Sequence, residues 1–485
     1  MPFYVRTLNM PLHRWTSASA AAVLSTLAGC ASVPDIPLQA QLNTLDHYAA
    51  GGALAAPVGD WPADHWWERY GDPQLDRFID EALRDSPTLV IAQARLEAAK
   101  GVSQFAGAAR LPEVRADAGV SEGKMSYAFT TPKAQTPHGW NAYGVAALNF
   151  NWELDFWGKN RSAFAAAVSE QRATQVEVAE ARLMLASSVS AAYAELAHLY
   201  ALRTVAQGTL QVRTHTVTLI ESRQRQELET LATLKQVQAR EASARAELDI
   251  TDERIALQKN AIAALIGAGP DRGQEIQPPS AKLDSVYGLP SELALDLVGR
   301  RPDIVAARLR TEAAASRIHQ HKAEFYPSVN LMGFGGLMSM GLDNLFKGDA
   351  SFGGGGPAIT LPVFNTERLQ GQLRGAHAEY NAAVAAYNAT LTNALHEIAD
   401  VITSRRALDS ELTSLQASVS LVQQSYDMVN RRYEGGLATY LDVLSVEDTL
   451  LTAQRGLSDT QSRTLALDVA LAQALGGGFA ESKTN

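Results

Sequence analysis

Apolar residues follow a coiled-coil repeat through the second half of the chain. Between Val384 and Val429, the positions at alternating steps of three and four residues are apolar, with the exception of Arg405. A 3.5-residue repeat that continues for more than six heptads predicts a long helix packed in a coiled coil. The first half of the chain shows the same spacing at Ala186, Val189, Tyr193, Leu196 and Tyr200. We therefore expect coiled-coil helices in both halves.

Proline positions limit these helices, because proline breaks helix interiors. The tracts between Pro137 and Pro270 and after Pro362 contain no proline. We predict long helices at about 158–226 and 367–434, each roughly 100 Å long at about 1.5 Å per residue. Shorter helices are predicted at about 87–111, 231–266, 302–326 and 438–475.

The chain also contains an internal repeat. At a constant offset of 215 residues, Pro87 aligns with Pro302 and Pro112 with Pro327. A repeat of this kind predicts two copies of one structural plan. The predicted organisation is a linker at 30–60, a first structural repeat at 61–275, a second at 276–479 and a tail at 480–485.

Each repeat holds a segment with the alternating pattern of β-strands. The strands are expected at 113–129, 142–156, 328–340 and 356–364. They form one predicted β-hairpin per repeat, at about 113–156 and about 328–364, and the second hairpin turns at a Gly-rich loop, Gly353–Gly356. Four strands cannot close a membrane barrel, and lipid does not tolerate an open sheet edge. Three chains would supply twelve strands, so the pattern favours an oligomer.

Residues 1–29 have the layout of an export signal, in which basic residues precede the small and apolar stretch Ala18–Leu27. Leu27-Ala28-Gly29-Cys30 resembles a bacterial lipobox. It implies cleavage before Cys30 and covalent lipid, S-diacylglycerol and an N-acyl chain, on that residue. Ala31 follows instead of the Asp that is linked to inner-membrane retention, which implies the outer membrane. A secreted protein with one leftover thiol is the alternative, and Met10 instead of Met1 is a second possible start.

Charge and motifs argue against nucleic-acid binding and against catalysis. Acidic residues number 52 and basic residues 42, which disfavours anionic partners. No run of 18 apolar residues occurs, so the sequence predicts no membrane-spanning helix. His396–Asp400 begins like a zinc-binding helix but lacks the second His, and Gly119–Lys124 lacks the spacing of a phosphate-binding loop. We expect no catalytic residue, no metal, no cofactor and no enzymatic activity.

From about Trp61 to Phe479 the chain resembles the TolC/NodT family of outer-membrane factors. The motifs are Trp66–Pro73 (WWERYGDP), Asn151–Lys159 (NWELDFWGK), Thr360–Phe364 (TLPVF) and Ala474–Gly478 (ALGGG). The resemblance implies a mixed fold, an all-α coiled-coil barrel plus a transmembrane β-barrel, with four strands and long helices per protomer. It also implies a homotrimer in the cell outer membrane that extends into the periplasm. Its implied partners are outer-membrane lipid, a periplasmic adaptor (membrane fusion protein) and an inner-membrane pump.

The family places a periplasmic gate at the turn between the last two helices. Gly435 and Gly436 permit this turn, since glycine accepts positive φ. Tyr433 and Asp442 match the tyrosine and aspartate that constrict the tunnel in the family. An alternative for Asp442 is a solvated carboxylate at a helix start.

The gate motif differs from that of the family's type member at two positions. Ala438 and Ser445 stand where that member has an Arg and a second Asp, and Arg431 or Arg432 could substitute. Which residues close the gate is therefore left open.

The expected function is a passive efflux channel for drugs or small toxic organic compounds, with a role in antibiotic resistance. A type I protein-secretion duct of the same family and a non-channel periplasmic coiled-coil scaffold are the alternatives. The sequence does not identify the substrate or the class of pump, which could be RND, MFS, ABC or another.

Overall fold

The computed structural model describes residues 33–44, 47–48, 54, 58–128, 132–281, 289–290, 293–362 and 364–481. The predicted export signal, Cys30, Val363 and the tail from residue 482 lie outside the described residues. The chain divides into two compact units. The sheet unit comprises Met1–Gln41, Glu97–Arg172 and Arg308–Ala385, and the hairpin unit comprises Leu42–Leu96, Ala173–Ala307 and Ala386–Asn485. Both units draw residues from both predicted repeats, and the repeat boundaries stay a prediction.

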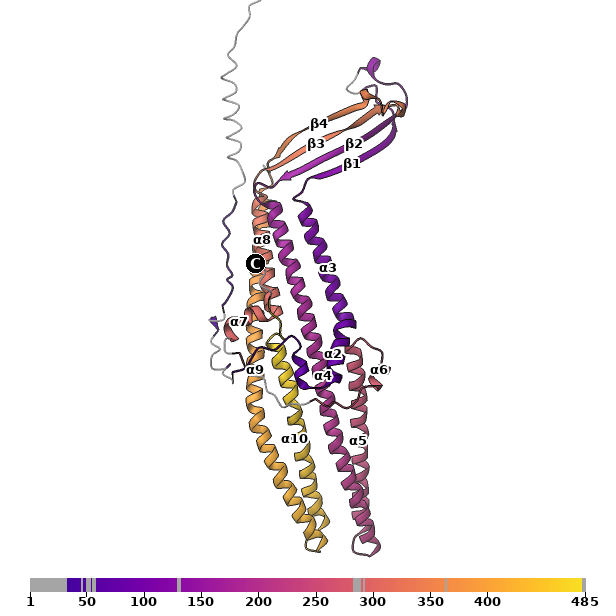
Figure 1. Cartoon of the computed structure of the whole chain (residues 1–485), viewed down its shortest axis with the longest axis vertical. Helices are drawn as coiled ribbons and strands as arrows, with labels where there is room; N and C mark the ends of the chain where they lie inside the picture. The colour runs from indigo at the N-terminus through magenta and orange to yellow at the C-terminus, as the bar shows by residue number, and fades with distance from the viewer. Residues whose placement is uncertain are drawn as a thin grey trace, which may run out of the picture. The chain divides into compact units, whose positions relative to one another are not determined.

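Two long helices dominate the chain, α4 (Lys159–Arg225) and α9 (Thr366–Glu434), each within one residue of its predicted bounds. Their shorter neighbours α5 (Leu231–Leu265) and α10 (Tyr440–Ala474) confirm two further predictions (Figure 1). The remaining helices are α2 (Pro73–Asp85), α3 (Pro87–Ala108), α6 (Asp271–Gln274), α7 (Leu293–Arg300) and α8 (Pro302–Ala323). Short 3-10 turns are η2 (Trp66–Tyr70), η3 (Lys133–Gln135), η4 (Leu342–Asn344) and η5 (Gly348–Ala350). Across the described part of the chain, no helix combines the length and apolarity needed to cross a membrane.

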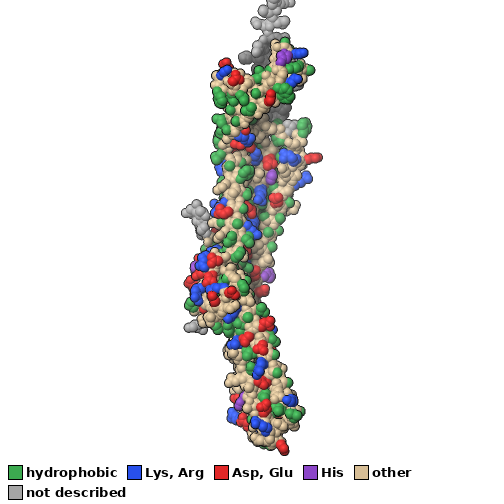
Figure 2. Space-filling view, turned by 90° about the vertical axis from the view of Figure 1, so that its right-hand side faces the viewer, with side chains coloured by type: hydrophobic (Ala, Val, Ile, Leu, Met, Phe, Trp, Pro, Cys, Tyr) green, Lys and Arg blue, Asp and Glu red, His purple; other side chains and the backbone are tan. Residues whose placement is uncertain are grey.

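The coiled-coil stripe of α9 changes in burial along the helix. Val384, Leu391 and Ile398 are fully buried, and Leu408 is 1% exposed. From Leu412 onward the stripe positions are only half-buried within one chain. Acidic and basic side chains are interspersed over the helices on the face shown in Figure 2.

The sheet unit holds one antiparallel sheet with the strand order β1-β2-β3-β4 (Figure 1). The strands are β1 (Glu113–Gly123), β2 (Asn141–Leu154), β3 (Ser328–Met340) and β4 (Ser351–Thr360). The two predicted hairpins are present, and β2 pairs with β3 to join them.

The predicted Gly-rich loop is wrong, because Gly353–Gly356 lie within β4. Residues 341–350 make the turn instead and carry η4 and η5. The glycines allow close packing: a carbon added at Gly354 would lie 3.2 Å from the Phe334 ring, and one at Gly355 would lie 2.9 Å from the Met332 carbonyl oxygen. Strand β4 also ends at Thr360, two residues before Pro362, and does not continue to 364 as predicted.

Candidate functional site: the helical tip and the sheet-to-helix passage

The turn between α9 and α10 closes as a Schellman motif. The N–H of Gly436 donates to Tyr433 O (3.0 Å), and the N–H of Leu437 donates to Arg432 O (2.8 Å). Gly436 has the positive φ that this motif requires, 71°. Gly435 does not, so only one of the two predicted glycines serves the turn through positive φ.

The turn between α4 and α5 has the same geometry without a glycine. Glu227 adopts a φ of 60°, and the N–H of Leu228 donates to Arg223 O (2.9 Å). A non-glycine residue in this conformation costs about 1–2 kcal/mol. The same backbone motif therefore ends both long helices.

Asp442 begins α10 in a reciprocal capping box. Its Oδ2 accepts hydrogen bonds from the N–H and the hydroxyl of Thr439, both at 2.8 Å, and the Thr439 hydroxyl accepts from the N–H of Asp442. The backbone and side-chain bonds from Thr439 lower the pKa of the exposed Asp442 carboxyl. Within one chain, Asp442 is therefore a helix-start carboxylate, and its part in a gate stays a prediction.

Tyr433 connects the two helical turns. It is 3% exposed, and its hydroxyl donates to Glu229 Oε1 (3.1 Å) in the α4–α5 turn. The Arg223 guanidinium lies over the Tyr433 ring at 4.5 Å, and the Tyr440 ring lies 5.7 Å away. Burial and the Glu229 carboxylate raise the pKa of Tyr433 to about 12, so the hydroxyl stays protonated. Sequence reasoning identified Tyr433 but missed Glu229 and Arg223, since no local pattern indicates a contact between hairpins.

The other residues considered for the gate are placed as follows. Arg431, Arg432 and Ser445 are exposed. Arg432 Nη2 donates to Leu437 O (3.2 Å), which supports the turn. Ala438 packs against a cluster that contains Tyr433 and Tyr440.

An ionic cluster also links the two hairpins. Asp448 accepts from Arg213 of α4 (2.5 Å) and from Arg240 of α5 (2.7 Å). Glu447, 2% exposed, lies 3.2 Å from Arg213 Nη1. Burial raises the pKa of Glu447, although Arg213 opposes the shift. Burial alone would also raise the pKa of Asp448, but hydrogen bonds from Arg240 and Arg213 outweigh it and lower that pKa. The sequence analysis missed this cluster.

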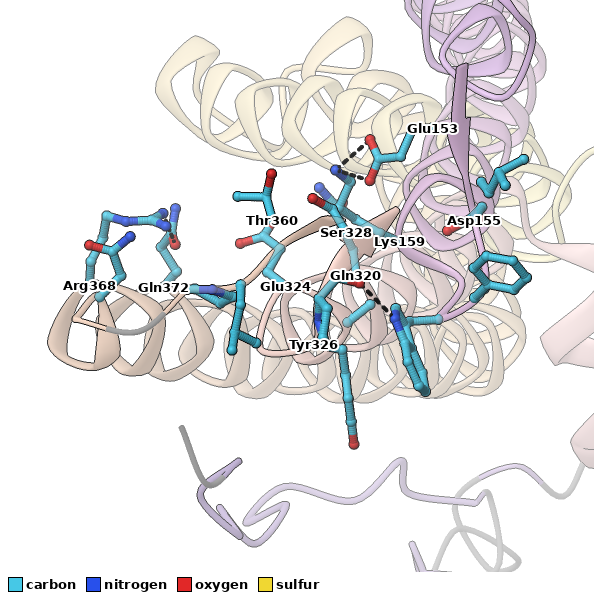
Figure 3. Close-up of a pocket in the computed structure, with 18 residues that line it drawn as sticks. Glu153, Asp155, Lys159, Gln320, Glu324, Tyr326, Ser328, Thr360, Arg368 and Gln372 are labelled. Atoms are coloured by element: carbon cyan, nitrogen blue, oxygen red, sulfur yellow. Dashed lines mark hydrogen bonds and ion pairs between the residues drawn. The ribbon is translucent and has the colours of Figure 1, made fainter. Parts of the chain in front are cut away.

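A second candidate site lies where the strands pass into the helices of the sheet unit. A cavity of about 570 Å³ is bounded by the last residues of β2, β4 and α8 and by the first residues of β3, α4 and α9 (Figure 3). On its wall, Lys159 Nζ lies 2.6 Å from Glu153 Oε1. Asp155 caps the start of α4 by accepting from the N–H groups of Asn160 (3.2 Å) and Arg161 (2.8 Å). The motif at Asn151–Lys159 therefore fixes the direction in which the chain leaves the sheet.

Aromatic side chains are exposed at this passage. The Trp157 indole N–H donates to Pro327 O (2.8 Å), and its ring stacks on Tyr326 at 4.7 Å and 17°. Trp157 is 52% exposed, Phe156 64% and Phe364 96%. Trp and Tyr rings are typical of a lipid–water boundary, and Trp157 and Tyr326 are the rings of that kind here.

The first described residues dock on the same unit. Val33 and Ile36 pack against a cluster that includes Phe325 and Leu369, and the N–H of Ala40 donates to Asn381 Oδ1 (3.3 Å). The chain is therefore anchored on the sheet unit from Val33 onward, three positions after the predicted lipidation residue.

The segment His396–Asp400 on α9, which begins like a zinc-binding helix, makes hydrogen bonds within the protein. His396 is exposed and its Nδ1 lies 2.9 Å from Thr392 O. Glu397 Oε2 accepts from buried Arg301 (2.7 Å). In the described ranges, no three His, Cys, Asp or Glu residues are grouped as metal ligands.

Comparisons with known proteins agree across most of the chain. A model of the outer membrane efflux protein family matches residues 78–268 and 293–477. The fusaric acid resistance protein FusA of Burkholderia cepacia is 33% identical over 384 residues, which cover 76% of this chain and 71% of the relative. The multidrug resistance outer membrane protein MdtP of Escherichia coli K12 is 28% identical over 481 residues, which cover 97% and 98%. The solved structure of the outer membrane protein VceC of Vibrio cholerae is 48% identical with a TM-score of 0.82, and the match covers 86% of this chain and all of that one.

Proposed function

This chain belongs to the outer membrane efflux protein family, and on that premise we propose that it is the trimeric, lipid-anchored channel of a tripartite efflux system. It is an outer-membrane efflux channel with a TolC-like fold and not an enzyme. The trimer, the lipid, the partners and the cargo are the proposed parts.

The edges of the sheet are the observation that supports a trimer. Among the described residues, β1 pairs only with β2 and β4 only with β3, which leaves two edges. Arg115 and Asp117 lie on one face of β1, whereas Val114, Ala116 and Val120 lie on the other. A sheet with an apolar face suits lipid, but its edges must be paired there. Three copies joined edge to edge would close twelve strands, and the half-buried end of the α9 stripe would gain neighbours in the same assembly.

The position of the first described residues supports a lipid on Cys30. Val33 and Ile36 dock on the sheet unit, the same unit that exposes Trp157 and Phe364 at the passage. Acyl chains on Cys30 would attach this unit to the membrane leaflet. Each buried methylene adds about 0.8 kcal/mol, and three chains in one assembly multiply the attachment.

The names of the relatives indicate which kind of compound the channel exports. One is named for fusaric acid resistance and another for multidrug resistance. We assign this channel the export of drugs or small toxic organic compounds. A passive channel holds no energy source, so an inner-membrane pump supplies the energy and a periplasmic adaptor joins the pump to the channel.

The helical tip is the proposed gate. Tyr433 ties the α9–α10 turn to Glu229 of the α4–α5 turn, and Gly436 lets α9 reverse. Asp442 is exposed beside this turn, where three copies would form a ring of carboxylates. Gly435 has no separate role in the geometry.

The proposed assembly is tested by the mass of the purified protein. After extraction in detergent, static light scattering should give the protein mass of three chains, and the same sample should conduct ions in planar bilayers. A stable monomer or dimer that conducts would contradict the joining of three sheets.

A further inference from the structure

One face of the sheet carries both charged side chains and large apolar side chains, on different strands. We define the channel face as the face of Arg115 and Asp117. Residues that are directly opposite on paired strands share a face. Arg115 pairs with Asn149, and Asn149 pairs with Phe334. Phe334 therefore lies on the channel face, and so do Met332, Met338 and Met340 at even steps along β3.

These side chains form a stripe that also includes β4. We name it the Met-Phe stripe, and its members are Met332, Phe334, Met338, Met340 and Phe352. The rings of Phe334 and Phe352 lie 5.7 Å apart, and Phe334 rests on Gly354. The exposed fraction is 51% for Met332, 47% for Phe334 and 55% for Met338. The glycines of β4 thus hold the aromatic ring in place and leave the methionines free at the surface.

Charge is divided between the two hairpins. Strands β3 and β4 contain no Asp, Glu, Lys or Arg. On the channel face of β1, Arg115 and Asp117 are charged, and Asp117 accepts from Asn149 of β2 (2.7 Å). The channel face therefore has a charged stripe beside an uncharged one.

The Met-Phe stripe does not face lipid. The opposite face carries Leu148, Phe150, Leu331 and Ile359, which suit lipid. The face of the stripe carries Arg115, Asp117 and Asn149, which suit a water-filled interior. Interiors of such sheets are normally polar, so an uncharged stripe of methionine and phenylalanine there is unusual and offers an apolar contact surface. Methionine is adaptable and is common on surfaces that bind many different partners.

We propose that the Met-Phe stripe is a transit site for the uncharged aromatic part of organic compounds in the channel. This proposal rests on the proposed efflux function and specifies which class of compound the channel carries. A flat ring would contact Phe334 and the methionine side chains, while polar substituents would reach Asn149 and Asn151 of β2. Contact with one aromatic ring is worth about 0.5–1.5 kcal/mol, which suits a site that must release its ligand.

Photolabelling of the assembled protein tests this site. Outer-membrane vesicles that contain the full chain are irradiated with 4-hydroxybenzophenone, and labelled peptides are mapped by mass spectrometry. Labelling at Met332 and Met338 should exceed that at Met428, a helical methionine of similar exposure (58%), by roughly two- to tenfold. Excess 1-naphthol should suppress only the labelling of the stripe.

A variant separates the stripe from general reactivity. Phe334→Ser should lower labelling at Met332 and Met338 toward the level at Met428, whereas Met428→Ser should leave the stripe unchanged. Two outcomes in protein that conducts ions would overturn the transit site: equal labelling of all methionines, or no competition by 1-naphthol. Neither outcome would contradict the proposed channel. Protein that does not conduct contradicts the channel and the stripe together.

Discussion

Removal of one hydroxyl at the tip should loosen the contact between the two helical turns. Tyr433→Phe deletes the donor to Glu229 Oε1 and keeps the ring against Arg223 and Tyr440. Hydrogen bonds to charged groups contribute about 1.5–3 kcal/mol, and we take the lower end because Glu229 is half-buried. If this contact holds the tip closed, the ratio of open to closed channels should rise by roughly tenfold for each chain whose bond must break on opening.

Single-channel recording in planar bilayers measures that ratio. The matched control is Tyr440→Phe, because the described residues give the Tyr440 hydroxyl no carboxylate acceptor and its ring lies in the same cluster. Tyr433→Phe should open more often than both the wild type and the control, and all three should remain trimers. If Tyr433→Phe and Tyr440→Phe open equally often, the bond between Tyr433 and Glu229 does not hold the tip, and the proposed gate lies elsewhere.

Four further substitutions test separate parts of the account. Cys30→Ser should abolish incorporation of labelled palmitate, and equal labelling of the mutant would refute the anchor. Asp442→Ala should weaken cation selectivity and block by multivalent cations in planar bilayers, because the carboxylate ring is lost while the trimer remains. Arg301→Ala should lower the free energy of unfolding in urea by about 1.5–3 kcal/mol, since its bonds to Asp303, Glu397 and the Ala474 carbonyl are lost. Asp72 is buried, yet bonds from Tyr193, Ser280 and Gln74 lower its pKa. It therefore adds stability above its usual pKa that is lost as pH falls through the lowered value, and Asp72→Asn should flatten this acid limb.

The helices were predictable from sequence because their signals are local and long. The heptad stripe between Val384 and Val429 and the proline-free tracts gave the ends of α9 and α4 to within a residue. Strand alternation from Val114 to Val120 likewise identified β1. These patterns depend on repeated spacing, which single residues do not disturb.

The failures came from contacts between distant segments. Gly353–Gly356 read as a loop, since glycine alone favours turns, but in the structure the Phe334 ring of β3 covers Gly354 and the β3 backbone approaches Gly355 closely. Glu229 and Arg213 became relevant only when folding brought them to Tyr433 and Glu447. The helix-start position of Asp442 was foreseen as an alternative, whereas its capping box with Thr439 was found only in the structure.

If this chain completes an export route for small organic compounds, cells without it should retain those compounds. Intracellular accumulation of a fluorescent aromatic dye should be compared in cells that lack the gene, in complemented cells and in the wild type, with the pump present in equal amounts. We expect higher accumulation in the deletion strain and a return to the wild-type level on complementation. Equal accumulation in all three strains for every drug or dye that the pump handles would contradict it.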